Sequence, residues 1–373
     1  MTRISSNVPL LPDFREYTNL LQEIWNSGKL SNNGPFVRRF ESDLKNYLRA
    51  DNLSLFVNGH SALCLALKAL RLQGEVITTT FTFASTIHAI VMSGLTPVFA
   101  DIDENSFTLD AVKVEPLITD KTCAILGVHI FGHPCDVEAI DRIAQKYGLY
   151  VIYDAAQAFG TKIKSAQRHI GSFGDISMFS LHANKVLNSI EGGILLWRDS
   201  ALSGYFEAAR NFGINYHAGG MSVDIPGVNA KMNEFQAAMG MLNLRKVDAE
   251  INARKRLALE YISSLREIPG ITTMSYRNDI EYNYAYFPII VDDDKYGHNR
   301  DELCEHLAVN GVETRKLYTE LCHRYACYEG KYKADVPIAE SISKRILDLP
   351  LYSTLSVDDI SFIGNLVRKF GKK

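Results

Sequence analysis

Short, continuously apolar runs alternate with segments of helical periodicity from about residue 53 to residue 197. The apolar runs lie at 53–57, 75–79, 96–101, 123–130, 149–156, 176–181 and 193–197, and helical patterns lie at 61–72, near 85–93 and near 136–147. Strands that are apolar on both faces are typical of a parallel sheet covered by helices on each side. The sequence therefore predicts an α/β fold built on a mostly parallel, seven-stranded sheet.

The pattern changes after a long helical stretch at roughly 231–265. Beyond it come a strand-like run, a helix and a terminal helix, at 285–293, 300–311 and 357–370. A chain of 373 residues exceeds the usual size of one hydrophobic core. We therefore expect a large α/β domain over residues 1–265, which includes the N-terminal segment and a linker helix, and a smaller α+β domain over residues 266–373. The first ~25 residues could also pack against the smaller domain.

Composition limits the class of protein. Hydrophobic residues make up 46% of the chain and charged residues 22%, with a formal net charge of −3, so nothing favours nucleic acid or an anionic membrane as a partner. The six cysteines form no CxxC pair and no metal-ligand spacing, so we expect no metal site. No apolar run reaches the ~18 residues of a membrane span, and the first residues lack the apolar core of a signal peptide. We expect a cytoplasmic enzyme without a membrane partner.

Polar residues gather where three of the predicted strands end. Ligands of parallel α/β sheets bind beyond the carboxyl ends of the strands. The first strand is followed by Asn58, Gly59, His60 and Ser61, the fifth ends near Asp154 and Gln157, and the sixth ends at Ser180. Lys185 follows in a polar loop that leads to two glycines (FSLHANKVLNSIEGG, 179–193). A solvated lysine needs no such setting, whereas a lysine that bonds covalently to a cofactor does.

A pyridoxal phosphate (PLP) site would use these residues together. A lysine that forms a Schiff base with the cofactor's aldehyde must spend time neutral. An acid beside the pyridine nitrogen lets the ring accept electrons, and Asp154 is the candidate, with Gln157 for the ring 3-hydroxyl. Phe83 and Ala156 are candidates for the two faces of the ring. The phosphate needs N–H groups and hydroxyls near a helix N-terminus, for which the candidates are Gly59, His60, Ser61 and Ser180.

Each signal has an ordinary structural explanation when it is taken alone. An aspartate at a strand end is as often a helix cap as a cofactor ligand, and Asn58-Gly59 before a serine is more often a turn and helix cap. Phe83 is more often part of a core, and a lysine before a polar loop is usually a solvated charge. The order of the set, with each piece at the end of a separate predicted strand, is what favours a PLP site.

Six stretches of the chain, taken in order, resemble the DegT/DnrJ/EryC1/StrS family of sugar aminotransferases. They are NGHSALCLAL, FTFASTIHAI, VIYDAAQAFG, GSFGDISMFSLHANKVLNSIEGG, GVNAKMNEFQAAMG and LPLY, and the likeness runs from about residue 28 to residue 352. The resemblance implies the aspartate aminotransferase fold (PLP fold type I) and a PLP-dependent transaminase. It also implies that Lys185 is the internal aldimine lysine and the base that moves protons between cofactor and substrate carbons.

The same resemblance implies further roles. Asp154 would hold the pyridinium proton and Gln157 the 3-hydroxyl. The phosphate would be held by Gly59, His60, Ser61 and Ser180, and by Asn229 from the neighbouring subunit of a homodimer with shared sites. The residues around the lysine loop that would order it or touch substrate are His182, Asn188 and Glu191.

The sequence departs from the family pattern at three positions. His60 replaces the usual threonine, which removes one hydroxyl from the phosphate site. Lys231 stands where arginine is frequent, and Ala183 where proline is frequent. None of these changes removes a group that the chemistry requires. One branch of the family carries histidine in place of the lysine and performs dehydration, and Lys185 argues against that branch.

The implied reaction moves an amino group from L-glutamate to a nucleotide-linked keto sugar. The expected acceptor is dTDP-4-keto-6-deoxy-D-glucose, which gives dTDP-4-amino-4,6-dideoxy-D-glucose for a surface polysaccharide, such as O-antigen or lipopolysaccharide, or for a glycoside. A 3-keto sugar is the main alternative. Side chains that could meet the diphosphate or hexose are Arg210, Tyr216, His217, Arg315 and Tyr318. Two other interpretations stay open: a PLP-binding sensor of sugar nucleotides without turnover, and an aminotransferase for a cyclic ketone outside nucleotide sugars.

Overall fold

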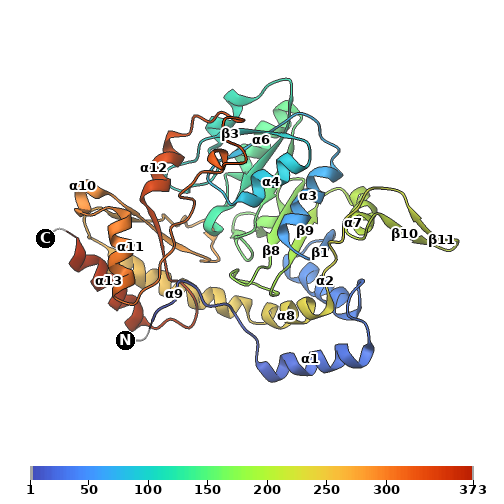
Figure 1. The fold of residues 1–373 in the computed structure, drawn as a ribbon, viewed down its shortest axis with the longest axis horizontal. Helices are drawn as coiled ribbons and strands as arrows, with labels where there is room; N and C mark the ends of the chain where they lie inside the picture. The colour runs from blue at the N-terminus through green and yellow to red at the C-terminus, as the bar shows by residue number, and fades with distance from the viewer. Residues whose placement is uncertain (1–2, 372–373) are drawn as a thin grey trace.

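The computed structural model describes residues 3–371 and is centred on a seven-stranded sheet (Figure 1). Across the sheet the strands are β1 (Leu53–Phe56), β9 (Gly193–Trp197), β8 (Ile176–Ser180), β5 (Tyr150–Asp154), β4 (Thr122–Val128), β2 (Glu75–Thr79) and β3 (Thr96–Ala100). β9 runs antiparallel to β1 and β8, whereas every other neighbouring pair of this sheet is parallel. This confirms the predicted α/β fold with a mostly parallel, seven-stranded sheet.

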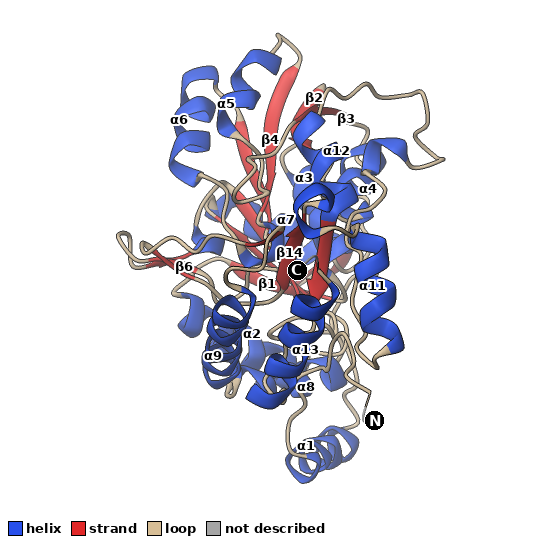
Figure 2. Cartoon of the chain, turned by 90° about the vertical axis from the view of Figure 1, so that its left-hand side faces the viewer, coloured by secondary structure: helices blue, strands red, loops and turns tan. Residues whose placement is uncertain are grey.

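Helices cover both faces of this sheet (Figure 2). They are α3 (Gly59–Ala69), α4 (Ala84–Met92), α5 (Ala111–Val114), α6 (Val137–Tyr147) and α7 (Ser203–Ala209). α3 packs on β8 and β9, whereas α6 packs on β4 and β5. α3 begins where the Asn58 side chain accepts a hydrogen bond from the Ser61 N–H, and α6 ends at Gly148, whose φ of 66° suits a glycine. The helices and strands predicted for this part of the chain lie within a few residues of these bounds.

The stretch predicted as one long helix at 231–265 is two helices, so that prediction is wrong in detail. α8 (Glu234–Leu244) and α9 (Val247–Leu265) are separated by a break at 245–246. α1 (Phe14–Ser27) and α2 (Pro35–Leu48) both pack on α8, whose residues are mostly buried. α9 packs instead on the last helix of the chain. The two helices therefore belong to different layers, which the shared apolar periodicity of the sequence did not show.

The chain beyond α9 forms a second, smaller sheet. Its antiparallel strands are β12 (Ile271–Thr273), β14 (Phe287–Val291) and β15 (Ile346–Leu349), and its helices are α10 (Asp293–Tyr296), α11 (Arg300–Val309), α12 (Pro337–Arg345) and α13 (Val357–Phe370). This sheet supports the division that we propose, with a large domain over 1–265 and a smaller one over 266–373. Ile4 pairs with Val312 while α1 lies on α8, so the N-terminal segment touches both parts.

Short strands and turns complete the described chain. β6 (Lys162–Ile163), β7 (Arg168–His169) and β13 (Ile280–Glu281) form a small sheet, and β10 (Ile214–His217) and β11 (Gly220–Val223) form a hairpin that projects from the body in Figure 1. Single 3-10 turns lie at Glu115–Leu117, Ile130–Gly132, Ile170–Ser172, Ser200–Leu202 and Cys322–Arg324. No helix within residues 3–371 is long and apolar enough to span a membrane.

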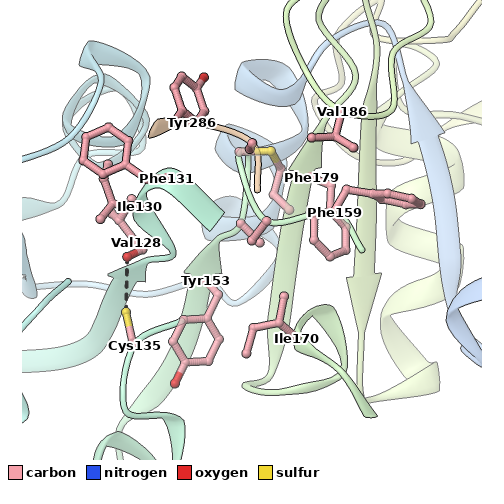
Figure 3. Packing of buried hydrophobic residues seen from close by; sticks show 14 of the residues in the cluster. Val128, Ile130, Phe131, Cys135, Tyr153, Phe159, Ile170, Phe179, Val186 and Tyr286 are labelled. Atoms are coloured by element: carbon pink, nitrogen blue, oxygen red, sulfur yellow. Dashed lines mark hydrogen bonds between the residues drawn. The ribbon is translucent and has the colours of Figure 1, made fainter. Parts of the chain in front are cut away.

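Packed side chains hold the strand ends that carry the site (Figure 3). Phe131, after β4, lies with its ring centroid 5.6 Å from that of Tyr286, which directly precedes β14. Phe159 and Phe179 meet edge to face at 5.5 Å. These contacts join the loops after β4 and β5 to β8 and to the smaller sheet. Because such interiors are close-packed, the residues above them are held in defined positions.

Candidate active site

A cavity of about 520 Å³ opens beyond the carboxyl ends of β1, β5 and β8. The predicted site residues that line it are Gly59, His60, Phe83, Asp154, Ala156, Gln157, Ser180, His182, Lys185, Glu191, Arg315 and Tyr318. A larger cleft of about 1120 Å³, along β3 and the chain before α12, contains none of them. The structure therefore brings together side chains from strand ends far apart in the sequence, and chemistry rather than size distinguishes this cavity.

Asp154 ends β5 and is 4% exposed. Its Oδ2 accepts a hydrogen bond from Thr86 Oγ1 at 2.8 Å, and its Oδ1 accepts one from the Ala156 N–H at 3.1 Å. Burial raises the pKa of this carboxyl, although the two hydrogen bonds and then the charges of Lys185 and His60 act to lower it. None of the ion pairs found within residues 3–371 involves Asp154. A buried carboxylate without a cation is costly, so this position suits a cationic ligand atom.

The turn between β1 and α3 forms the candidate phosphate cup. Asn58 Oδ1 accepts a hydrogen bond from the Ser61 N–H at 2.8 Å, which leaves the N–H groups of Gly59 and His60 at the helix N-terminus for a ligand. β9 lies close behind this turn. A Cβ added to Gly193 would lie 2.6 Å from Asn58 O, so the close approach requires a glycine. The second glycine of the EGG stretch therefore shapes the cup.

His60 occupies the cup where the family pattern has threonine. Its Nδ1 lies 2.9 Å from Ser85 Oγ, and its Nε2 lies 3.7 Å from Cys64 Sγ. Burial, followed by repulsion from His88, lowers the pKa of the imidazole. The ring is therefore neutral near pH 7. The replacement of threonine by histidine removes a side-chain hydroxyl but keeps the backbone N–H of residue 60, which can still donate to a phosphate.

Lys185 projects into the cavity from the loop between β8 and β9. Its Nζ lies 3.4 Å from Tyr286 Oη and 5.9 Å from the centroid of that ring. The loop is closed by hydrogen bonds from the Leu181 N–H to Gly192 O (2.8 Å) and from the Ser189 N–H to Leu181 O (2.9 Å). The backbone that carries Lys185 is therefore held in place, and its side chain points into the cavity. This differs from the alternative explanation, in which the lysine is a solvated surface charge.

Gln157 links the cavity to the C-terminal part of the chain. Its Oε1 accepts a hydrogen bond from the Phe131 N–H at 2.6 Å, and its Nε2 donates one to Tyr318 Oη at 2.7 Å. Burial raises the pKa of the Tyr318 hydroxyl well above its usual range, so this group stays protonated. An amide nitrogen carries two hydrogens. The second hydrogen on Gln157 Nε2 is thus free to donate to a ligand oxygen.

Phe83 lies at the rim of the cavity as the residue before α4, and its side chain is 67% exposed. The ordinary explanation, that Phe83 is part of the core, is wrong because a core ring would be covered. Ala156 lines the same cavity from the β5 side. An exposed aromatic ring beside a cavity is well placed to stack on a planar ligand.

His182 and Glu191 lie at the two ends of the lysine loop and are both exposed. His182 Nε2 is 3.5 Å from Glu191 Oε1, and His182 Nδ1 is 2.8 Å from Asn184 Oδ1. These contacts tie the first and last residues of the loop together beside the cavity. The predicted role in ordering the loop fits this placement.

Asn188 and Arg210 require a correction. Asn188 is 2% exposed, and its Nδ2 donates to Leu10 O at 2.9 Å instead of facing the cavity. Arg210 is buried between Glu41 and Glu207, with N–O distances of 2.8 and 2.7 Å. Both side chains are used in internal contacts, so neither touches a substrate in this cavity. A polar residue near a motif does not reveal from sequence whether the fold has already paired it.

Four other predicted residues lie outside the cavity. Ser61 is half-buried behind the cup, and its N–H is taken by Asn58. Tyr216 and His217 are exposed on β10, and Asn229 is exposed with its Oδ1 accepting a hydrogen bond from Lys231 Nζ at 2.8 Å. None of the four is among the residues that line the cavity of their own chain.

Several lining residues were missed by sequence reasoning. They include Thr82, Ser85, His129, Asn184, Tyr286 and Leu317, and Thr86 adds a bond to Asp154 from just outside the lining. Tyr286 lies in an apolar run that predicts only a strand, so the sequence carried no signal for its contact with Lys185. Phe83 of the FTFAST stretch was assigned to ring stacking, yet the last two residues of that stretch, Ser85 and Thr86, contact His60 and Asp154.

The residues of this cavity fit PLP. Asp154 offers the pyridine nitrogen a buried acid that no cation within residues 3–371 pairs with, Gln157 offers the 3-hydroxyl an N–H, and the α3 N-terminus offers the phosphate two N–H groups. Lys185 supplies the amine for the aldehyde. Within the described chain no group of three or more His, Cys, Asp or Glu side chains is arranged to hold a metal ion.

Comparison with known proteins gives the same family over nearly the whole chain. The sequence model of the DegT/DnrJ/EryC1/StrS aminotransferase family matches residues 13–368. An Escherichia coli protein named dTDP-4-amino-4,6-dideoxy-D-glucose transaminase is 39% identical over 96% of each chain, and a Shigella dysenteriae protein of that name is 36% identical over 97% of each chain. The crystal structure of DesI in the presence of its TDP-sugar product is similar with a TM-score of 0.92 at 34% identity, covering 99% of this chain and 93% of that one. The chain belongs to the DegT/DnrJ/EryC1/StrS aminotransferase family.

Proposed function

We propose that the protein transfers an amino group from L-glutamate to a nucleotide-linked keto sugar, with PLP as its cofactor. The proposed acceptor is dTDP-4-keto-6-deoxy-D-glucose and the product is dTDP-4-amino-4,6-dideoxy-D-glucose, a precursor for a surface polysaccharide or glycoside. The observation that carries the proposal is that Lys185 shares one cavity with Asp154, a buried carboxyl that forms no ion pair with any other described residue. The names of the E. coli and S. dysenteriae relatives support the choice of sugar.

The cofactor would be held by three groups of contacts. Asp154 keeps a proton on the ring nitrogen, because a buried carboxylate favours a cation beside it. Gln157 Nε2 would donate to the 3-hydroxyl oxygen, and Phe83 and Ala156 would contact the two faces of the ring. The N–H groups of Gly59 and His60 and the Ser180 hydroxyl bind the phosphate, which the positive end of the α3 dipole also favours.

Lys185 would carry the proton transfers. When bound, the cofactor supplies an electron sink for the bond that breaks at the donor carbon. Lys185 Nζ would take the proton from the α-carbon of glutamate. With the keto sugar the same amine moves a proton in the opposite direction. General acid–base transfer of this kind is typically worth ~10²–10⁴-fold in rate.

We also propose that the protein is a homodimer in which Asn229 reaches the phosphate site of the neighbouring subunit. Asn229 is exposed and lies outside the cavity of its own chain. The adjoining β10–β11 hairpin carries exposed apolar side chains, with Tyr216 75% exposed and Met221 and Val223 also uncovered. An exposed apolar hairpin that projects from the body is a feature that a partner subunit would cover.

The test is a reaction of the purified protein with PLP, L-glutamate and dTDP-4-keto-6-deoxy-D-glucose, followed by mass spectrometry and NMR of the product. The wild type should form the 4-amino sugar. Lys185→Ala should bind PLP without turnover, whereas Lys121→Ala, which removes an exposed lysine from the loop before β4, should retain wild-type activity.

Other outcomes would separate the alternatives. A glutamate-dependent spectral change without a 4-amino product would reject this acceptor, and a 3-keto sugar would be tried next. Amination that is indifferent to the nucleotide would indicate a cyclic ketone substrate. A spectrum that glutamate leaves unchanged would contradict the donor or the aminotransferase activity and favour the sensor.

A further inference from the structure

Arg315 lies in the chain between α11 and α12 and contributes a fixed guanidinium to the cavity. Its Nε and Nη2 both donate to Asp348 Oδ2, at 3.0 and 2.6 Å. Asp348 is buried on β15 and is itself held by the Phe287 N–H at 3.0 Å. The edge of the guanidinium formed by Nε and Nη2 is therefore occupied by Asp348, and this buried carboxylate fixes the orientation of the group.

The opposite edge of Arg315 has no protein partner among residues 3–371. Nη1 donates no hydrogen bond there, and Nη2 has a second hydrogen beyond the one directed at Asp348. The guanidinium carbon lies 5.1 Å from the centroid of the Tyr286 ring. The hydroxyl of that same tyrosine lies 3.4 Å from Lys185 Nζ. One tyrosine thus contacts both the proposed base and a guanidinium with a free bidentate edge.

We propose that Arg315 binds the α-carboxylate of the amino donor, an inference that rests on the proposed aminotransferase function. The α-carboxylate is attached to the carbon that loses its proton to Lys185, so its binding group must lie near that lysine. A guanidinium edge matches the two oxygens of a carboxylate, with two parallel charge-assisted hydrogen bonds. Arg315 is the one arginine among the cavity-lining residues of the described chain. A hexose ring offers hydroxyls at this point and gives a guanidinium no matching charge.

The alternative anion for Arg315 is a phosphate, and the placement of Gln157 argues against the cofactor phosphate. On the pyridine ring of PLP the 3-hydroxyl and the phosphate-bearing carbon flank the aldehyde carbon on opposite sides. Gln157, proposed for the 3-hydroxyl, is bonded to Tyr318, three residues after Arg315. The phosphate cup is built instead from α3 and the end of β8. Arg315 therefore belongs to the 3-hydroxyl side of the ring.

The test measures each half-reaction separately in single turnovers of the PLP-loaded protein, followed by absorbance. Arg315→Gln should lower kcat/KM for L-glutamate by about 10- to 100-fold, the value of a charge-assisted bidentate contact. The reverse half-reaction, with the amino sugar as donor, should change by less than about threefold because that substrate carries no α-carboxylate. Arg315→Lys keeps the positive charge but not the planar pair of N–H donors. Its kcat/KM for L-glutamate should therefore lie between that of wild type and that of Arg315→Gln.

The matched control is Lys316→Gln. This neighbouring cation is exposed and pairs with Asp301 at 2.7 Å, outside the cavity. The Lys316→Gln substitution should leave the rates of both half-reactions unchanged. Calorimetric titration with glutarate, which has the carboxylates but no amine, supplies a readout independent of turnover: binding should be lost in Arg315→Gln and kept in Lys316→Gln. Thermal unfolding of each variant checks that the fold survives.

Three results would overturn the assignment. Equal losses in both half-reactions would mean that Arg315 shapes the site in general, and a loss confined to the amino sugar would assign it to the nucleotide sugar. A loss with L-glutamate but not with L-glutamine, which lacks the side-chain charge, would assign it to the γ-carboxylate. If the wild type itself reacts with no amino donor, the proposed aminotransferase function is wrong. That result differs from the three above, in which the wild type is active and only the assignment of Arg315 is wrong.

Discussion

At the scale of single residues, the site depends on a carboxylate that the cofactor-free chain does not neutralise. Asp154 is buried, and its two oxygens receive one hydroxyl and one backbone N–H, but no cation of the described chain pairs with it. Burial raises the pKa of this carboxyl above its usual value. The protein therefore gives up stability at this position to keep an acid ready for a cationic ligand.

Asp154→Asn should separate stability from function. Because the folded pKa of Asp154 is raised, this group's contribution to stability is fully present below the unfolded pKa of an aspartate and is lost as the pH rises through the folded pKa. The cofactor-free variant should therefore be more stable than wild type at neutral pH, and the difference should vanish in acid. Transamination should fall by at least ~10²-fold because the ring nitrogen loses its acid. Thermal unfolding of the cofactor-free proteins between acid and neutral pH, with activity assays, checks both parts. A variant that is less stable at pH 7 would contradict the account.

At the scale of elements, the phosphate cup depends on how closely β9 approaches the β1–α3 turn. Gly193 opens β9 and leaves no room for a Cβ, which would lie 2.6 Å from Asn58 O. The antiparallel direction of β9 brings this glycine to the same end of the sheet as Asn58. The second glycine of the EGG stretch is thus explained by the packing of β9 against β1 and the β1–α3 turn.

Gly193→Ala should push the cup away from its ligand position. The overpacking should cost about 1–3 kcal/mol of stability and should weaken PLP binding by ~10-fold or more. The matched control is Gly204→Ala in α7, where an added Cβ meets nothing within 4 Å. That variant should be slightly stabilised, because alanine is the better helix former. PLP titration and chemical denaturation of both variants measure these effects, and equal PLP affinity in the two would show that the approach of β9 does not matter.

At the scale of the whole molecule, the proposed dimer makes each site a product of two chains. Asn229 is exposed and outside the cavity that holds its own Lys185. The segment that carries it pairs with the end of β1, since the Val57 N–H donates to Ala230 O at 2.7 Å. The sheet edge therefore presents Asn229 outward in a defined position, beside the exposed hairpin.

Mixing two inactive variants tests this arrangement. In a hybrid of Lys185→Ala and Asn229→Ala subunits, one site loses both groups, whereas the other keeps Lys185 from one chain and Asn229 from its partner. Equal mixing with subunit exchange should therefore restore activity to about a quarter of wild type. Each variant alone, carried through the same exchange, is the control. No recovery after exchange, when exchange itself is shown by a size-tagged subunit, would place Asn229 in its own chain's site or outside any site.

The sequence by itself determined the sheet, the family and the chemistry of the cavity. Continuous apolar runs require burial on both faces, and the groups proposed to bind one cofactor follow those runs at fixed points along the chain. Asp154, Gln157, the α3 turn and Lys185 were predictable because each lies at the end of a locally recognisable element. The break at 245–246, the contact of Asn188 with Leu10 and the ion pair of Arg210 with Glu41 were not predictable, because each depends on packing between parts of the chain that are distant in sequence. Tyr286 and Arg315 became site residues only when the smaller sheet packed against the larger one, since long-range packing decides which polar groups are satisfied internally and which are left facing a ligand.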